Sequence, residues 1–145
     1  LILLGDLLYH GPRNDLPPFY HPKKVIPILS EMKDSIIAVR GNCDAEVDQM
    51  VLPFPILDDR REIEVDGKRI LLIHGHHETD TTGFDIVMSG HTHIPVLEER
   101  EGVVFLNPGS TTIPKGGSVP SYAIWDDGKI SIISLDNGDI VKEWE

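Results

Sequence analysis

Cysteine and long apolar runs are both scarce in this sequence. Among 145 residues there is a single cysteine, Cys43, which excludes an internal disulfide framework and favours a reducing compartment such as the cytoplasm. No apolar stretch reaches the roughly 20 residues that a membrane-spanning helix requires. The start also lacks the pattern of a signal peptide. We therefore expect a cytoplasmic protein with no membrane partner.

Positively charged residues are also scarce in this sequence. The chain has 13 Lys and Arg against 24 Asp and Glu, which gives a formal net charge of -11. A surface that follows a nucleic-acid backbone would normally carry a basic stripe, so long nucleic acids are not expected as partners. Some of the carboxylates are instead candidates for neutralisation by bound cations.

Four short apolar runs each end at a turn that contains glycine and a potential metal ligand. A short apolar run bounded by turn signals is typical of a buried strand. In open α/β sheets, functional groups gather just beyond the carboxyl ends of the strands, so we expect these turns to converge on one site. The runs and turns are Leu1 to Leu4 before Gly5-Asp6, Ile36 to Val39 before Gly41-Asn42, Ile70 to Ile73 before His74-Gly75-His76, and Ile86 to Met88 before Gly90-His91-Thr92-His93.

The side chains at these turns predict a metal site of mixed oxygen and imidazole ligands. Either histidine pair alone would be typical of a surface loop, and the prediction depends on their repetition at the ends of strands. A mixed set suits manganese, iron or zinc and suits calcium poorly. The candidate ligands are Asp6, Asn42, His74, His76, His91 and His93.

The order of the elements changes from strand–helix units at the front to β-hairpins at the back. A helix is expected to begin near Lys23, because Pro27 is tolerated only in a first turn. A shorter helix is expected between Ala45 and Leu52. Turn pairs then predict hairpins, and they are Asp66-Gly67, Glu101-Gly102, Asp127-Gly128 and Asn137-Gly138. This organisation indicates two stacked sheets with helices outside.

Two places suggest that residues are absent from the sequence. The chain opens inside an apolar strand at Leu1, without an initiator methionine. The polar stretch from Thr79 to Gly83 joins two strand patterns that would need a longer crossover if they are parallel. We expect residues 1–145 to form a single domain whose N-terminal strand, and residues near Thr79 to Gly83, are missing.

Taken in order, the motifs at the strand ends resemble those of calcineurin-like metallophosphoesterases. They are Gly5-Asp6, Gly41-Asn42-Cys43-Asp44, His74-Gly75-His76 and Gly90-His91-Thr92-His93. Other stretches narrow the resemblance to small bacterial YfcE-type phosphodiesterases, namely Asn42 to Met50, His10 to Asn14, Asn107 to Ser110 and Ile113 to Gly117. The resemblance implies the metallophosphoesterase fold, an α/β four-layer αββα sandwich of two mixed β-sheets flanked by helices. The family's first motif, Asp-x-His, has no counterpart here, and a missing N-terminus would explain this.

The resemblance further implies a metal-dependent phosphodiesterase that hydrolyses small phosphodiesters with a hydroxide bridging two divalent metal ions. Asp6 would bridge the ions, because two cations roughly 3.5–4 Å apart need a shared anionic ligand. Asn42, His74 and His91 would complete the second metal site, and His93 would serve the first. Mn²⁺ is the expected metal, with Fe, Zn, Ni or Mg as alternatives. Because relatives commonly self-associate, a homodimer or homotetramer is also expected.

Asn42 and His76 are the residues expected to be catalytic. His76 has three possible roles: contact with phosphate, protonation of the leaving group, or orientation of His74; we place it on the phosphate side. Cys43 stands where many relatives have a histidine that is associated with leaving-group protonation, so both a catalytic and a packing role remain open. Asp44 would either hold a neighbouring histidine or cap the loop.

A protein-binding scaffold is the alternative class of function. The retromer scaffold subunit resembles this family in fold yet acts as a binding platform. Retention of Asn42 favours chemistry in this chain. The segment with His10, Arg13 and Asn14 follows the Asp6 turn closely enough to line a cleft, where Arg13 would meet a substrate phosphate. A solvent-exposed loop without a role at the site is an equally supported interpretation.

Overall fold

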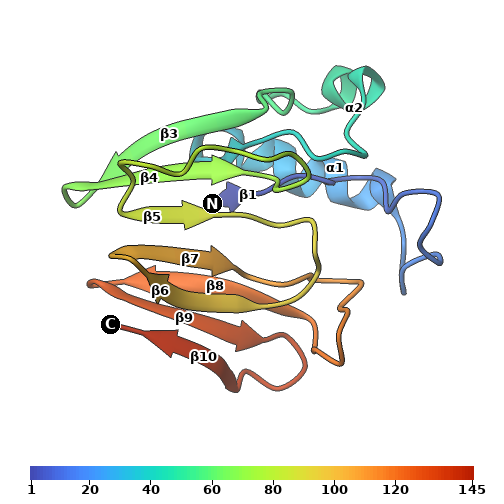
Figure 1. Cartoon of the computed structure of the whole chain (residues 1–145). Helices are drawn as coiled ribbons and strands as arrows, with labels where there is room; N and C mark the ends of the chain where they lie inside the picture. The colour runs from blue at the N-terminus through green and yellow to red at the C-terminus, as the bar shows by residue number, and fades with distance from the viewer.

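Three β-sheets and two α-helices make up the fold in the computed structural model, which describes residues 1–145 (Figure 1). The first sheet is a parallel pair formed by β1 (Ile2–Leu3) and β2 (Ile37–Ala38). The second has the order β3-β4-β5-β7-β6, with β3 (Arg60–Val65), β4 (Lys68–Ile73), β5 (Ile86–Met88), β6 (Val96–Arg100) and β7 (Val103–Asn107). The third has the order β10-β9-β8, with β8 (Ser121–Asp126), β9 (Lys129–Ser134) and β10 (Ile140–Trp144).

The five-stranded sheet is mixed, and its three inner strands run in parallel. Ile86 of β5 pairs with Ile70 of β4 on one side and with Val104 of β7 on the other. The carboxyl ends of β4 and β5 therefore lie side by side, and the N–H of Gly90 donates to the carbonyl oxygen of His74 at 2.9 Å. The carboxyl ends of β1, β4, β5 and β7 all point to the same end of the molecule (Figure 1).

All four predicted hairpins are confirmed. β3 pairs with β4, β6 with β7, β8 with β9, and β9 with β10, each antiparallel. Each turn contains the expected pair of a polar residue followed by glycine. Asp66, Glu101 and Asp127 take the positive φ that such tight turns require. The connection between β4 and β5, residues 74–85, contains no helix. The expectation of absent residues near Thr79 to Gly83 stays a prediction.

The main core lies between the five-stranded sheet and the two other sheets. Alternate residues of β4 point to opposite faces, as the pleat of a strand dictates, so Ile70 and Leu72 face this core while Leu71 and Ile73 face away. On the opposite side the core is closed by Val39, which follows β2, and by β9 residues that include Ile130. The predicted stacking of sheets therefore holds, with β1–β2 and β8–β10 sharing one face of the five-stranded sheet.

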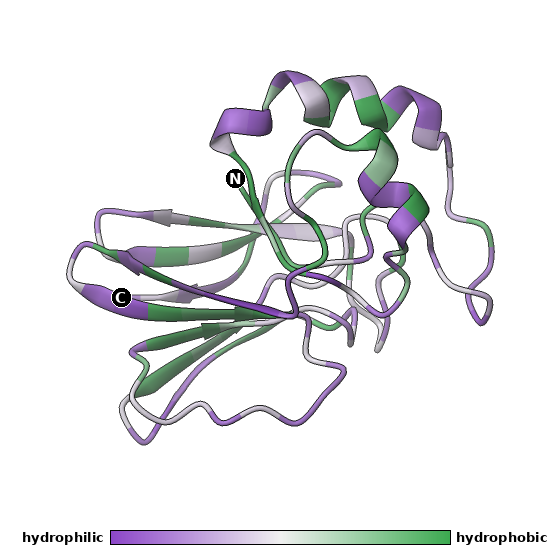
Figure 2. Ribbon diagram, turned by 90° about the horizontal axis from the view of Figure 1, so that it is seen from above, coloured by the Kyte–Doolittle hydropathy of each residue, from purple (hydrophilic) through white to green (hydrophobic).

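Both helices lie on the outer side of the β1–β2 pair (Figure 2). α1 (Pro22–Glu31) packs Ile26 and Leu29 against a cluster around Ala38, and α2 (Glu46–Val51) follows the turn after β2. A short 3₁₀-helix, η1 (Lys33–Ser35), follows α1. The expectation that Pro27 lies in the first turn is wrong, since α1 begins at Pro22 and Pro27 is inside it. The carbonyl of Lys23, which loses its helical partner, lies on an exposed residue where water can satisfy it.

The free face of the five-stranded sheet is covered by arginine side chains. Arg69 and Arg60 lie over the ring of Phe84, with guanidinium carbons 4.9 and 5.9 Å from its centroid, and Arg100 lies 4.1 Å from that of Phe105.

The predicted mixed α/β class is confirmed. The layers in residues 1–145 are helices, the β1–β2 and β8–β10 sheets together, and the five-stranded sheet, so the fourth layer stays a prediction. None of the helices has the length and hydropathy to span a membrane.

Candidate metal centre

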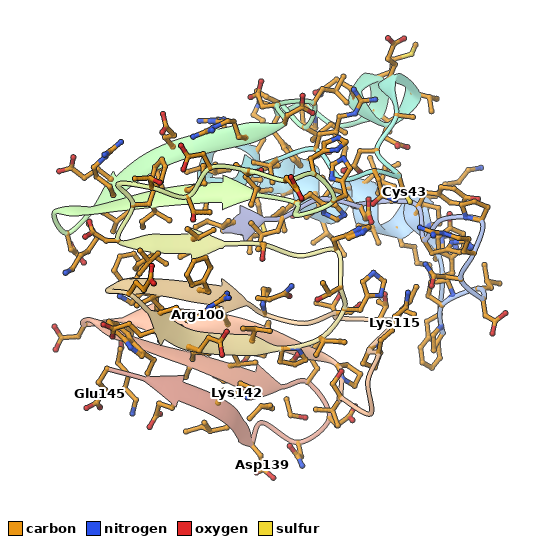
Figure 3. All side chains as sticks on the ribbon, viewed as in Figure 1. Cys43, Arg100, Lys115, Asp139, Lys142 and Glu145 are labelled. Carbon is orange, nitrogen blue, oxygen red and sulfur yellow. The ribbon has the colours of Figure 1, made fainter.

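The structure brings together four of the predicted ligands from four different strand ends. Asp6 follows β1, Asn42 follows β2, His74 follows β4 and His91 follows β5. The Nε2 atom of His74 lies 3.2 Å from Oδ2 of Asp6 and 3.0 Å from Oδ1 of Asn42. The Nδ1 atom of His91 lies 3.2 Å from the same oxygen of Asn42 and 3.3 Å from Nε2 of His74. Figure 3 places Cys43, the neighbour of Asn42, at this end of the molecule and Arg100 at the other.

A buried carbonyl fixes the orientation of the His74 ring. The side chain of His74 is 2% exposed, and its Nδ1–H donates to the carbonyl oxygen of Leu4 at 2.6 Å. Since Nδ1 carries this hydrogen, Nε2 of the neutral ring is a lone pair that faces Asp6 and Asn42. The carboxylate and amide oxygens are also acceptors, so only a cation or a proton between these atoms makes their close approach favourable.

The spacing of these donor atoms fits a divalent cation. A metal bonded at roughly 2.0–2.2 Å to octahedral or tetrahedral ligands holds neighbouring donors about 3.0–3.5 Å apart. The contacts among Asp6, Asn42, His74 and His91 fall between 3.0 and 3.3 Å. Imidazole, thiolate and carboxylate groups alone form no group of three that could hold a metal. The fit therefore depends on the amide oxygen of Asn42.

Three of the predicted ligands have a left-handed backbone. Asp6, His91 and His93 have φ values of 58°, 66° and 60°. This region is unfavourable for residues with a Cβ, although Asp and His enter it more often than most, and such strain concentrates at functional sites. The tight turns after β1 and β5 aim these side chains at the carboxyl ends of the sheet.

Two glycines allow the turns after β1 and β2 to touch. Gly5 has φ of 101°, and a Cβ added there would lie 2.6 Å from both the Cα of Gly41 and Nδ1 of His74. A Cβ on Gly41 would in turn collide with the backbone and carboxylate of Asp6. Close backbone contact at these two positions is what brings Asp6 within reach of the His74 ring.

Asp44 holds the same two turns together through backbone hydrogen bonds. Its carboxylate accepts from the N–H groups of Gly41 at 2.7 Å, Asp6 at 2.8 Å and Leu7 at 2.9 Å, while the side chain is almost fully buried. Of the two roles considered for Asp44, loop capping is the one observed, and it contacts no histidine. Asp6 is tied back in the same way, since its Oδ1 accepts the N–H of Cys43 at 2.9 Å.

Most of this chain matches a known protein family. A family model described as "Calcineurin-like phosphoesterase superfamily domain" matches residues 2–128. The chain belongs to the calcineurin-like phosphoesterase superfamily. The resemblance seen in the sequence is thereby confirmed.

Relatives of this phosphoesterase include proteins with a curated activity. Phosphodiesterase YfcE of Escherichia coli strain K12 is 44% identical over 148 residues, which cover 99% of this chain and 80% of YfcE. Phosphodiesterase MJ0936 of Methanocaldococcus jannaschii is 31% identical over 117 residues, which cover 72% of this chain and 70% of that one.

Solved structures confirm the metallophosphoesterase fold. The structure of E. coli YfcE, described as a phosphoesterase, superposes with a TM-score of 0.94 at 43% identity and covers 99% of this chain and 81% of its own. Vacuolar protein sorting 29 from Cryptosporidium parvum superposes with a TM-score of 0.63 at 20% identity, covering 99% of this chain and 96% of its own. At that identity the second likeness concerns the fold alone.

Electrostatics in this phosphoesterase make Asp6 and His74 a pair of opposite charge. Burial opposes ionisation of Asp6, but hydrogen bonds from His74 and the Cys43 amide hold its pKa below the usual value. Burial likewise opposes protonation of His74, yet Asp6 and the Leu4 carbonyl raise its pKa above the usual value. The raised pKa of His74 therefore favours a proton on Nε2, at the position where a cation would bind.

The surroundings of His91 favour its neutral form. Burial lowers its pKa, the positive charge of His74 lowers it further, and Asp6 opposes both; smaller repulsions come from His93 and Arg13. A neutral imidazole is the form that binds a metal ion. His91 is therefore ready to act as a ligand without losing a proton.

His93 and His76 lie outside this set of contacts. The Nδ1–H of His93 donates to the carbonyl oxygen of Ile113 at 2.8 Å, which leaves Nε2 without a partner inside the protein. The ring of His76 lies 5.2 Å from that of His74 and 3.9 Å from that of His77, and its buried Nδ1 has no hydrogen-bond partner. No hydrogen bond joins His76 to His74. The Leu4 carbonyl is the group that orients the His74 ring.

The turn with His91 and His93 is supported by Asn107, the last residue of β7. Asn107 is buried, and its Nδ2 donates to the carbonyl oxygen of Gly90 at 2.7 Å and to Oγ1 of Thr92 at 3.1 Å. Its Oδ1 accepts the N–H of Gly109 at 3.0 Å. One side chain thus joins the turn after β5 to the turn after β7.

Proposed function

We propose that this chain is a metal-dependent phosphodiesterase that hydrolyses small phosphodiesters. The observation that carries the proposal is the convergence of four potential metal-ligating atoms, from Asp6, Asn42, His74 and His91, at spacings of 3.0–3.3 Å. Membership of the phosphoesterase superfamily and 44% identity to phosphodiesterase YfcE support it. A binding scaffold would have no need of four potential metal ligands held this close together.

In this proposal, two divalent cations are bound, with Asp6 as their shared ligand. Asn42, His74 and His91 would hold the second ion, and Nε2 of His93 would be available to the first. When bound, the ions supply a hydroxide nucleophile and positive charge that stabilises the transition state. Mn²⁺ is the metal that we propose, because a mixed oxygen and nitrogen site accepts it well.

The side chains of the protein position these groups and the substrate. The Leu4 carbonyl keeps Nε2 of His74 directed at the metal, and Asp44 keeps the Asp6 turn against the Asn42 turn. Asn42 and His76 are the proposed catalytic residues. His76 would use its ring N–H to donate to a phosphoryl oxygen, because its ring lies beside those of His74 and His91.

The test is hydrolysis of bis(4-nitrophenyl) phosphate compared with 4-nitrophenyl phosphate, with and without Mn²⁺. We expect metal-dependent cleavage of the diester, and a fall of at least about a hundredfold in Asn42→Ala and His74→Ala. His21→Ala is the matched control, since His21 precedes α1 and makes no capping hydrogen bond. A folded protein that cleaves neither ester with any divalent metal would reject the proposal.

The same proposal includes three finer statements. The domain is residues 1–145, the assembly is a homodimer or homotetramer, and the compartment is the cytoplasm, which the single cysteine favours. Sedimentation equilibrium of the purified protein tests the assembly, and a monomer at micromolar concentration would contradict it.

A further inference from the structure

A strained phenylalanine stands at the tip of the loop that joins β1 to α1. Residues 17–20 form a β-turn, in which the N–H of Tyr20 donates to the carbonyl oxygen of Pro17 at 3.2 Å. Pro18 occupies the second position, and Phe19 the third, with φ of 58°. This is the pattern of a type II turn, whose third position calls for glycine. A bulky side chain at positive φ is an outlier that local folding does not explain.

The ring of Phe19 also gains nothing from burial. Its exposure is 101%, while Tyr9 and Tyr20 on the same loop are 41% and 39% exposed. A residue that is both strained and fully exposed contributes nothing to the stability of the fold. Strain of this kind is retained at sites that contact ligands.

Other aromatic rings gather behind this turn. The ring of His10 lies edge-on to that of Tyr20, with centroids 5.1 Å apart, and 4.8 Å from that of Tyr9. The hydroxyl of Tyr20 donates to the carbonyl oxygen of Leu8 at 3.1 Å, which fixes its ring. The buried Nδ1 atom of His10 has no hydrogen-bond partner within the protein. The loop therefore presents aromatic surface from Tyr9 and Tyr20, which are partly exposed, beside the fully exposed ring of Phe19.

This loop is continuous with the candidate metal centre. Leu7, one residue after Asp6, is bound by Asp44, and Gly11 is so close to the next turn that a Cβ there would lie 3.0 Å from Sγ of Cys43. The side-chain amide of Asn14 donates to the carbonyl oxygen of His10 at 2.6 Å and closes the loop on itself. Figure 1 shows the loop projecting at the end where the strands β1, β4 and β5 terminate.

We propose that the loop of residues 9–20 is a subsite for the nucleobase of a substrate in which one ester group of the phosphodiester is a nucleoside. Aromatic faces bind any base by stacking, and the positive charge of Arg13 on the same loop, which acts on Cys43 and His91, suits the phosphate of the nucleotide. Phe19 is the specificity-determining residue, because its ring is free to stack. This inference rests on the proposed phosphodiesterase function and narrows its substrate to nucleotide-like phosphodiesters.

The experiment compares two esters that release the same 4-nitrophenolate: the 4-nitrophenyl ester of adenosine 5′-monophosphate and methyl 4-nitrophenyl phosphate. In the wild-type protein with Mn²⁺, we expect kcat/KM to favour the adenosine ester. Phe19→Gly removes the ring and relieves the strain, so the protein stays folded while the ratio of the two kcat/KM values falls about five- to hundredfold. Phe19→Tyr keeps an aromatic ring and should keep the ratio.

Asp127→Gly is the matched control, because Asp127 also has positive φ, 48°, but lies in the β8–β9 turn. It should leave the ratio unchanged. An unchanged ratio in Phe19→Gly would overturn the inference while leaving the phosphodiesterase function standing. If Phe19→Gly instead converts an oligomer into monomers in sedimentation and keeps the ratio, Phe19 serves self-association and the inference is likewise overturned.

A binding measurement separates this inference from the function on which it rests. The affinities of adenosine 5′-monophosphate and inorganic phosphate are measured by calorimetry with Mn²⁺ present. If no ester is hydrolysed, yet the nucleotide binds more tightly than phosphate and Phe19→Gly removes the difference, the subsite is supported and the proposed function fails. Equal affinities in both proteins would overturn the subsite.

Discussion

At the scale of the residue, Asp44 supports the candidate centre without touching a histidine. Its three backbone N–H donors come from both turns that carry Asp6 and Asn42. In Asp44→Asn, the amide NH₂ would face one of these donors, which leaves a buried group unsatisfied. We expect a loss of about 1–3 kcal/mol in the free energy of unfolding, measured with urea.

The control for Asp44 is Asp139→Asn. Asp139 is exposed in the β9–β10 turn, far from Cys43 in Figure 3, and its carboxylate accepts no hydrogen bond within the protein. Its substitution should change the free energy of unfolding by less than about 0.5 kcal/mol. Equal effects of the two substitutions would mean that Asp44 does not hold the turns.

His74 carries a prediction about protons. Its pKa lies above the usual value, so the Asp6–His74 pair stabilises the metal-free fold below about pH 6.5, and this contribution is lost as the pH rises through the raised pKa. A metal ion must displace that proton. We expect Mn²⁺ binding to release more protons at pH 6.5 than at pH 8.5, as counted by calorimetry in buffers of different ionisation enthalpy.

A proton count that stays constant across this pH range would contradict the prediction. The lowered pKa of His91 favours its neutral form, so this ring is expected to contribute less to the proton release than His74. His74 and His91 are therefore expected to differ in the number of protons that each releases when the metal ion binds.

At the scale of the element, the contact between the turns after β1 and β2 requires glycine. Gly5→Ala would combine positive φ with a Cβ that lies 2.6 Å from backbone, whereas Gly128→Ala combines positive φ with open space. We expect Gly128→Ala to cost about 1 kcal/mol, measured by thermal unfolding. Gly5→Ala should cost more and should also weaken Mn²⁺ binding, and similar costs with intact binding would contradict this.

Elements with strong local signals were predictable from the sequence. Aspartate–glycine and asparagine–glycine pairs between apolar runs identified the hairpins, because such tight turns need positive φ. The position of Pro27 inside α1 was not predictable from the sequence, because an exposed carbonyl at Lys23 tolerates the missing amide of the proline. Chain order also cannot reveal that both helices lie on one side, since that depends on which sheet face remains apolar.

The candidate site was predictable in its residues and less so in its geometry. Asp6, Asn42, His74 and His91 converge because parallel strands end at one edge of a sheet. The roles of these ligands, and those of His76 and His93, stay predictions. The left-handed backbone of His91 and the triple hydrogen bonding of Asp44 depend on contacts between distant turns, which spacing along the chain does not encode.

At the scale of the whole molecule, metal binding should be visible as stability. A ligand that binds only the folded state at a hundred times its dissociation constant adds about 2.7 kcal/mol. We expect Mn²⁺ to raise the melting temperature, EDTA to reverse the rise, and His74→Ala to abolish it. His21→Ala should keep the full shift in differential scanning calorimetry. A shift of equal size in His74→Ala would place the metal elsewhere.

The turn with Phe19 also matters for anyone who evolves this protein in the laboratory. Glycine is the residue that the backbone at this position prefers, so a library ranked by heat resistance alone would enrich Phe19→Gly early. Such a round would discard the very ring that we assign to substrate choice. Variants selected for thermal stability should therefore accept a broader range of phosphodiesters. Whether thermal stability or substrate selectivity is screened first will decide which enzyme is obtained.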